Sequence, residues 1–143
     1  MIAVGCDHGG YPLKLAVLAY LKEHGLEYWD LGCDSAEAAD YPLYGKAVGR
    51  AVAQGICEKG IVICSTGIGI SIAANKVPGV RCALCGDTFS ARATRQHNDA
   101  NVLALGALVT GAGLALEIVD IFLSTPFSGA ERHRRRIAQL EEG

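Results

Sequence analysis

The sequence predicts a single three-layer α/β/α domain, residues 1–143, with a Rossmann-like five-stranded parallel sheet. Short apolar runs alternate with longer segments of helical periodicity, which is typical of a parallel sheet covered by helices on both faces. The length corresponds to about one domain. Glycine is enriched, at 18 of 143 residues, which suggests tight loops that approach a ligand.

The amino-terminal third contains two predicted strands and one helix. Ile2–Gly5 is a short apolar run and is expected to be the first strand. Pro12 suits the first turn of a helix, in which apolar residues recur at helical spacing until Gly25 ends it. Glu27–Leu31 is expected to form the second strand, and a polar loop follows.

In the middle of the chain, Pro42 opens a second helix that runs to about Gln54. Gly60–Cys64 reads Gly-Ile-Val-Ile-Cys, a continuous apolar run expected of a strand buried on both faces. A glycine-rich loop follows it, and then a short helix to about Lys76.

The last third repeats the alternation of strand and helix. Arg81–Cys85 is the fourth predicted strand, and Asp87 is placed to cap a helix over Thr88–His97. Val102–Leu105 is the fifth predicted strand, and Leu114–Leu123 is the helix after it. An arginine-rich helix is expected at the carboxyl end.

Charge and hydropathy exclude some classes of function. Thirteen basic and fifteen acidic side chains give a net charge of -2, so overall charge does not drive binding to nucleic acid or to a membrane. The uncharged stretch Ala100–Leu116 is at the lower length limit for a membrane span and is interrupted by glycines. We expect it to form a buried strand and helix. No targeting segment is visible, so a cytoplasmic location is expected.

The six cysteines are expected to be reduced thiols. Cys82 and Cys85 have the spacing of a metal or redox pair, but no second pair or nearby histidine completes a zinc site. Residues three apart on a strand face opposite sides, so the two sulfurs should diverge. Buried packing is the favoured interpretation, and a metal or redox cysteine protein is the alternative.

Two loops carry most of the residues that could do chemistry. Gly5–Gly10 follows the first strand, and Ser65–Gly69 follows Cys64 at the end of the third. Ligands of open parallel sheets bind beyond the carboxyl ends of the strands, so these loops face one cleft if the two strands are neighbours. The amides of a glycine-rich loop before a helix can bind an anion and stabilise a thiolate beside it. Neither loop has the pattern of a Walker loop or of a dinucleotide site, and no cofactor is expected.

Further polar residues could serve an acid/base site. Asp7 and His8 end the first strand, and His97 ends the fourth helix, while six of the eight arginines lie at position 92 or beyond. Together with the Cys64 thiol, these residues are the types needed to transfer protons on a phosphorylated substrate. Non-catalytic interpretations stay open. The histidine after the first strand could be a surface residue, and His97 could complement the helix dipole. The arginines could form a solvated helix face, and the glycine loop could serve packing.

These segments resemble the ribose-5-phosphate isomerase B family over nearly the whole chain. The matching motifs are Gly5-Cys6-Asp7-His8-Gly9-Gly10, Asp40-Tyr41-Pro42, the run from Cys64 to Lys76 (CSTGIGISIAANK), Arg95-Gln96-His97-Asn98-Asp99-Ala100-Asn101 and Arg132-His133-x-x-Arg136. The family also includes isomerases of galactose 6-phosphate and allose 6-phosphate.

The resemblance implies a metal-independent interconversion of ribose 5-phosphate and ribulose 5-phosphate through an enediolate. Cys64 matches the base that takes the proton from C2 and returns it at C1, and Thr66 matches the hydroxyl beside it. The amides that would stabilise oxyanion charge are those of Ser65, Thr66, Gly67, Ile68 and Gly69.

Other matches concern ring opening and substrate binding. Asp7 and His97 match the groups that assist opening of the furanose ring, Asn98 matches a contact to a sugar hydroxyl, and Tyr41 matches a wall of the cleft. The residues that match the phosphate site are His8, Arg132 and Arg136. The two arginines are four apart, so they share one helix face and can hold one dianion.

Two positions depart from the family pattern. Ser65 stands where glycine is usual, and serine would be strained if that position needs a positive φ. Ile70 stands where another branch of the family has a glutamate base, which leaves Cys64 as the candidate base.

The resemblance also implies a homodimer, or a dimer of dimers, whose active sites are shared between subunits. The function predicted from the sequence is isomerisation of a small sugar phosphate, with ribose 5-phosphate favoured by the His97-Asn98 pair. A six-carbon sugar phosphate is the alternative within the family. A non-catalytic phosphosugar-binding domain is the alternative from another class, although sensing needs neither Cys64, Asp7 nor His97.

Overall fold

Five parallel strands form the central sheet of the computed structural model, which describes residues 1–143. The strands are β1 (Ile2–Cys6), β2 (Tyr28–Asp30), β3 (Lys59–Cys64), β4 (Cys82–Leu84) and β5 (Val102–Gly106). Their order is β2-β1-β3-β5-β4, and every neighbouring pair is parallel. The predicted sheet is confirmed, and β1 and β3 are neighbours. The edge strands β2 and β4 are shorter than predicted, because each pairs on one side only and is less buried.

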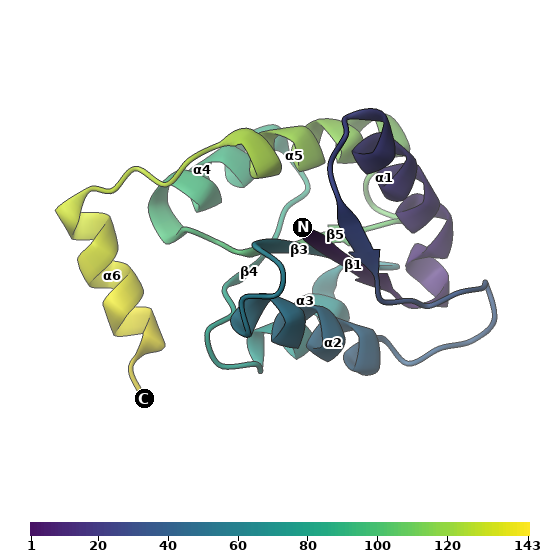
Figure 1. Ribbon diagram of the computed structural model, residues 1–143, viewed down its shortest axis with the longest axis horizontal. Helices are drawn as coiled ribbons and strands as arrows, with labels where there is room; N and C mark the ends of the chain where they lie inside the picture. The colour runs from purple at the N-terminus through teal and green to yellow at the C-terminus, as the bar shows by residue number, and fades with distance from the viewer.

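Helices cover both faces of this sheet. They are η1 (His8–Gly10, a 3₁₀ turn), α1 (Tyr11–Glu23), α2 (Tyr41–Ala53), α3 (Ile68–Asn75), α4 (Thr88–Asn98), α5 (Ala112–Ser124) and α6 (Glu131–Glu141). Figure 1 shows α1, α4 and α5 above the sheet and α2 and α3 below it. The three predicted layers are therefore confirmed, and α6, the arginine-rich helix, lies outside them.

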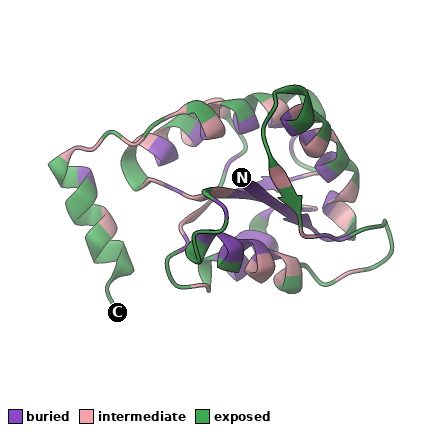
Figure 2. Cartoon of the chain, viewed as in Figure 1, coloured by how far each residue is buried: buried purple, intermediate pink, exposed green.

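The central strands are buried on both faces, as their continuous apolar runs predict (Figure 2). Because side chains alternate along a strand, β3 sends Ile61 and Ile63 into the core under α1, α4 and α5. It sends Val62 and Cys64 into the other core, under α2 and α3. Cys64 thus ends its strand on the side of the sheet that α3 covers.

Cys82 and Cys85 diverge as expected. Cys85 belongs to the core beneath α1, α4 and α5, whereas Cys82 packs against the opposite core. Burial raises the pKa of Cys82 to about 12 and that of Cys85 to about 11, so both remain protonated near neutral pH. These properties agree with packing and with neither metal binding nor thiolate chemistry.

Local signals at the helix ends are mostly where the sequence predicts them. Pro12 and Pro42 lie in the first turns of α1 and α2, and the Asp87 carboxylate accepts the Ser90 N–H over 2.6 Å to cap α4. The stretch 100–116 contains β5 and the start of α5. No helix has the length and apolar character needed to cross a bilayer.

Candidate active site

The loops after β1 and β3 lie side by side. Cys6 pairs with Ile63 in the sheet, and the Asp7 N–H donates to the Ile63 carbonyl over 3.3 Å, which continues the pairing beyond the strand. Gly9 then approaches Ser65 so closely that any side chain at position 9 would collide with the serine hydroxyl. The predicted juxtaposition of the two loops is confirmed.

Cys64 is the last residue of β3 and is 5% exposed. Its sulfur accepts a hydrogen bond from the Gly67 N–H, with 3.1 Å between Sγ and nitrogen. Gly67 has φ +79 and turns the chain into α3, a conformation that a residue with a side chain adopts only with strain. The turn therefore folds its own amide back onto the thiol, an interaction that strengthens when the sulfur is a thiolate.

The rest of this loop has amides free to bind a ligand. The carbonyls of Cys64 and Ser65 accept from the N–H groups of Ala107 and Leu108, each over 2.9 Å. The backbone N–H groups of Ser65, Thr66 and Gly69 donate to no protein acceptor. The Cys64 and Ser65 carbonyls are thus occupied by hydrogen bonds to the residues after β5, while the free amides of the loop lie at the start of a helix. Free amides at a helix start can bind an anion.

Ser65 is not strained. Asp99 is the one residue other than glycine with a positive φ, so Ser65 takes the place of glycine in an ordinary backbone conformation. Ile70, at the position where a related branch has glutamate, is fully buried between α3 and the sheet.

The first loop adds a buried carboxylate and an exposed imidazole. One oxygen of Asp7, which is 7% exposed, accepts the Gly10 N–H over 3.1 Å. His8 is exposed, and its Nδ1 lies 3.1 Å from the Ala39 nitrogen and 3.2 Å from the Ala39 oxygen. These contacts hold the ring by Nδ1 and leave Nε2 without a partner in the chain.

Tyr41 contributes to the same region from the start of α2. Its ring packs directly against Gly69, where an added Cβ would lie 2.6 Å from ring carbons. The ring is 40% exposed, and it lies beside the free amides of the β3 loop.

The remaining predicted residues form a separate cluster. His97 and Asn98 end α4, and the His97 ring packs against the tilted ring of His133 in α6, with 4.6 Å between ring centroids. The Thr94 hydroxyl donates to Oδ1 of Asn98 over 3.0 Å. Arg132 and Arg136 are exposed on α6.

This second cluster lies near the amino-terminal ends of the strands, whereas Cys64 lies at a carboxyl-terminal end. The Gly60 N–H, at the start of β3, donates to the Asn101 carbonyl just beyond α4. Cys64 is at the other end of the same strand, about 13 Å from Gly60 at the usual rise per residue. Within one chain, therefore, the structure does not bring His97, Asn98 and the two arginines to Cys64.

Two buried groups were missed by sequence reasoning. Lys14 is 1% exposed, and its ammonium binds Asp30 over 2.8 Å and the Cys33 carbonyl, so it anchors the segment that leads to Ala39 and His8. His133 is 5% exposed and lies 2.6 Å from the Ser128 hydroxyl. Burial lowers its pKa, and the nearby positive charges of arginines on α6 lower it further. Its burial could not be read from an arginine-rich segment.

No group of three or more histidine, cysteine, aspartate or glutamate side chains is arranged to hold a metal ion. The groups that this chain offers in the loops after β1 and β3 are a thiol, a carboxylate, an imidazole, two hydroxyls and a set of amides.

Comparison with known proteins decides the family. The family model for ribose/galactose isomerases matches residues 2–140. The chain belongs to the ribose/galactose isomerase family. The family predicted from the sequence is confirmed, and the motifs at β1, β3, α4 and α6 all lie within the matched residues.

Several members of the family are closely similar. Ribose-5-phosphate isomerase B of Escherichia coli is 50% identical over 139 residues, covering 97% of this chain and 93% of that protein. A galactose-6-phosphate isomerase subunit of Clostridium acetobutylicum is 37% identical, with coverage of 99% and 82%. The solved structure of Clostridium thermocellum ribose-5-phosphate isomerase B superposes with a TM-score of 0.96 at 51% identity, with coverage of 98% and 94%.

Proposed function

We propose that this protein is an aldose–ketose isomerase that interconverts ribose 5-phosphate and ribulose 5-phosphate, with Cys64 as base and without a metal ion. The observation that carries the proposal is the position of the Cys64 sulfur: it lies at a strand end, accepts a hydrogen bond from the Gly67 amide, and begins a loop whose Ser65, Thr66 and Gly69 amides have no acceptor. Family membership supports the reaction class.

The isomerisation step needs one base and a site for negative charge. In the proposed step the Cys64 thiolate takes the proton from C2, and charge develops on the C1 oxygen as the enediolate forms. Amides of the Ser65–Gly69 loop stabilise that charge, foremost those of Ser65, Thr66 and Gly69, which have no acceptor in the chain, and Thr66 supplies a hydroxyl beside it. The proton then returns to C1, while a proton moves from the C2 oxygen to the C1 oxygen. Ile70 is buried and apolar, which leaves Cys64 as the base within the loop.

Ring opening and phosphate binding require residues from both clusters. Asp7 and His97 are proposed to assist opening of the furanose, and Asn98 to contact a sugar hydroxyl. The phosphate is proposed to bind at Nε2 of His8 and at the two arginines of α6, listed above. Tyr41 forms a wall of the cleft.

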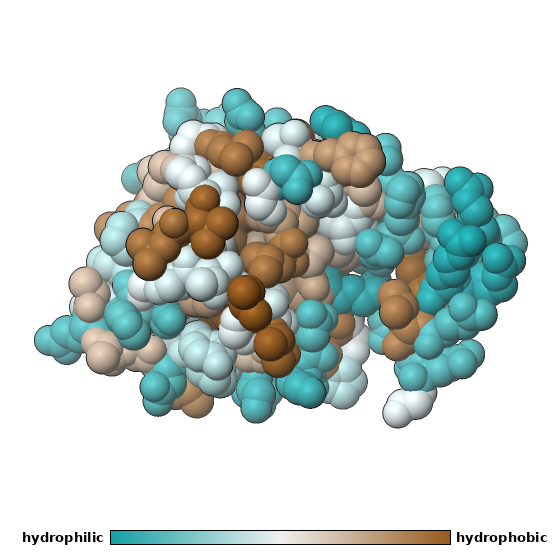
Figure 3. Space-filling view, turned by 180° about the vertical axis from the view of Figure 1, so that it is seen from behind, coloured by the Kyte–Doolittle hydropathy of each residue, from teal (hydrophilic) through white to brown (hydrophobic).

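Because one chain keeps these clusters apart, we propose a homodimer, alone or paired into a tetramer, in which each site is shared. Exposed apolar side chains at the carboxyl edge of the sheet support this arrangement: Leu43 is 67% exposed, Ile68 52%, Leu108 81% and Val109 70%. Figure 3 shows hydrophobic side chains gathered in the middle of the face opposite to that of Figure 1. For each shared site to be complete, the second copy must place the ends of its own α4 and α6 at the Cys64 loop.

A six-carbon sugar phosphate is the second candidate substrate, because a galactose-6-phosphate isomerase subunit is among the similar proteins. A cytoplasmic location agrees with a phosphorylated metabolite as substrate. The decisive experiment compares initial rates on ribose 5-phosphate, allose 6-phosphate and galactose 6-phosphate, with and without a chelator. Preference for ribose 5-phosphate and insensitivity to the chelator are expected. Loss of activity with the chelator would contradict the metal-free mechanism, and absence of turnover would leave a binding domain.

A further inference from the structure

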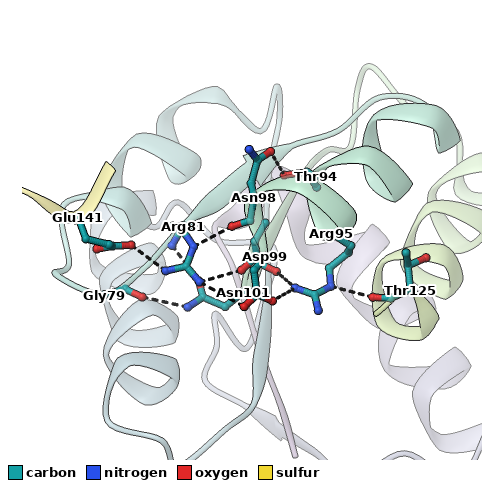
Figure 4. Close-up of polar contacts among 10 residues, drawn as sticks. Gly79, Arg81, Thr94, Arg95, Asn98, Asp99, Asn101, Thr125 and Glu141 are labelled. Carbon is teal, nitrogen blue, oxygen red and sulfur yellow. Dashed lines mark hydrogen bonds and ion pairs between the residues drawn. The ribbon is translucent and has the colours of Figure 1, made fainter. Parts of the chain in front are cut away.

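The turn that ends α4 is held by the guanidinium of Arg81. Its Nε donates to the Asn98 carbonyl and its Nη2 to the Asp99 carbonyl, each over 2.9 Å (Figure 4). The last carbonyls of a helix have no partner within the helix, and a cation there also complements the helix dipole. Arg81, which precedes β4, thus caps the helix that carries His97 and Asn98.

Arg95 holds the same turn from the other side. It donates to the Asp99 carboxylate over 2.8 Å, to the Ala100 carbonyl over 2.7 Å and to the Thr125 carbonyl over 3.1 Å. Asp99 itself has φ 46, the left-handed conformation that ends α4. The end of α4 is thereby fastened to α5 by one arginine and to the sheet by the other.

Arg81 also reaches α6. Its Nη1 lies 2.7 Å from the Glu141 carboxylate, at the far end of that helix. Near its start, α6 is held by His133, whose ring packs against that of His97. The two attachments are eight residues apart, about 12 Å along the helix axis. Arg136 lies between them, and Arg132 is next to the first.

The attachment by Glu141 matters because α6 has few others. His133 is its one buried residue, and the helix extends away from the three layers in Figure 1. A helix of eleven residues is marginal by itself in water, so external contacts decide how it is held. Without the Glu141 contact, α6 could pivot about His133.

From these contacts we infer that Arg81 and Glu141 are positioning residues, which hold the phosphate-binding arginines of α6 in register with His97 and Asn98. This inference rests on the proposed function, because it assigns both clusters to one substrate. One guanidinium binds the end of α4 and the end of α6 at once, so it sets the spacing between the ring-opening and phosphate-binding groups. Lysine could not replace it, since an ammonium cannot reach two carbonyls and a carboxylate in this planar arrangement.

Glu141→Ala tests the inference with little risk to folding. The ion pair is partly exposed on both sides, and such pairs contribute little to global stability. We expect KM for ribose 5-phosphate to rise on the order of tenfold, less than for loss of a phosphate-binding arginine, with kcat nearly unchanged. Glu142→Ala is the matched control, because its exposed side chain makes no ion pair or hydrogen bond, and it should behave as wild type.

Arg81→Lys completes the test. This variant loses the cap of α4 as well as the Glu141 contact, so it should raise KM and also slow turnover of ribose 5-phosphate. Glu141→Ala combined with Arg81→Lys should be no worse than Arg81→Lys alone, because both act through one contact. Amide hydrogen exchange in residues 137–141 should speed up in both variants, with the unfolding midpoint of Glu141→Ala unchanged.

An active wild-type enzyme with an unchanged KM in Glu141→Ala would overturn the inference and leave the proposed function intact. If Glu141→Ala lowers kcat as much as it raises KM and also lowers the unfolding midpoint, Glu141 has a structural role only. That result would also overturn the inference. A wild-type protein without activity on any of the three sugar phosphates would contradict the proposed function and the inference with it.

Discussion

The Gly67 N–H points at the Cys64 sulfur, with 3.1 Å between the two heavy atoms. Gly67 has φ +79, and an added Cβ would collide with Leu84 and with the backbone of β5. The turn after β3 therefore depends on glycine, and its shape brings the amide to the thiol. This contact links the backbone geometry of the loop to the proposed chemistry of the cysteine.

Cys64→Ala should lower kcat by at least about 10²–10⁴-fold, the usual effect of losing a general base, while substrate still binds. Exchange of the C2 hydrogen with solvent deuterium, followed by NMR, should stop as well. Cys57→Ala is the control, since Cys57 is also buried but lies just before the amino-terminal end of β3, away from the loop. Continued exchange in Cys64→Ala would move the base to another residue.

His97→Asn should slow ribose 5-phosphate far more than a four-carbon aldose phosphate esterified at O4. The four-carbon compound cannot close a furanose ring, so it does not need the ring-opening step assigned to His97 and Asp7. Cys64→Ala should slow both substrates alike. Initial rates on the two substrates check this, and equal losses in His97→Asn would place the histidine in the enediolate step.

Arg136→Ala should raise KM for phosphorylated sugars about tenfold to 100-fold, because a charge-assisted bond to phosphate contributes roughly 1.5–3 kcal/mol. Weak activity on free sugars should hardly change. Arg135→Ala is the matched control, because Arg135 is an exposed arginine of the same helix whose side chain makes no hydrogen bond or ion pair within the chain. If both arginine variants lose activity on phosphorylated and free sugars alike, the charge serves the helix and not the substrate.

Gly69→Ala should displace the Tyr41 ring, since the new Cβ would lie 2.6 Å from ring carbons. We expect a lower kcat/KM and a loss of about 1–3 kcal/mol in the free energy of unfolding, typical of overpacking. Gly111→Ala, where an added Cβ meets nothing within 4 Å, should change neither quantity. Urea unfolding and steady-state kinetics measure the pair, and an unaffected Gly69→Ala would mean that Tyr41 moves aside freely.

The attachment of α6 should weaken in mild acid. Burial and nearby positive charge lower the pKa of His133 below its ordinary 6.5, so the unfolded chain binds protons more readily than the folded one. Neutral His133 therefore makes its full contribution to the free energy of unfolding above about pH 6.5. That contribution should be lost as the pH falls below this value. Hydrogen exchange of α6 between pH 5 and 7.5 measures this. His133→Phe, which keeps a ring against His97, should lose the dependence, and an identical profile in that variant would refute the assignment.

The sequence by itself determined the fold class and one half of the candidate site. Apolar runs such as Gly60–Cys64 and the helical spacing after Pro12 are local patterns, and each follows from the burial of one short segment. The meeting of the β1 and β3 loops was also predictable, because the carboxyl ends of neighbouring parallel strands share one edge of the sheet. Whether Ser65 replaces glycine without strain depended on a φ value that only the structure supplies.

The tertiary structure decided where the other half of the site lies. Helix α4 starts after β4 at the carboxyl edge and runs back across the sheet, so His97 ends at the opposite edge from Cys64. The local pattern around His97 does not predict this position, because it depends on the order of the strands and the length of the helix. Contacts between segments far apart in the chain likewise bury Lys14 and His133. Such contacts also allow Arg81 to bind the ends of two helices. Periodicity records which face of a segment is buried, whereas the identity of the neighbour on that face is a property of the assembled fold.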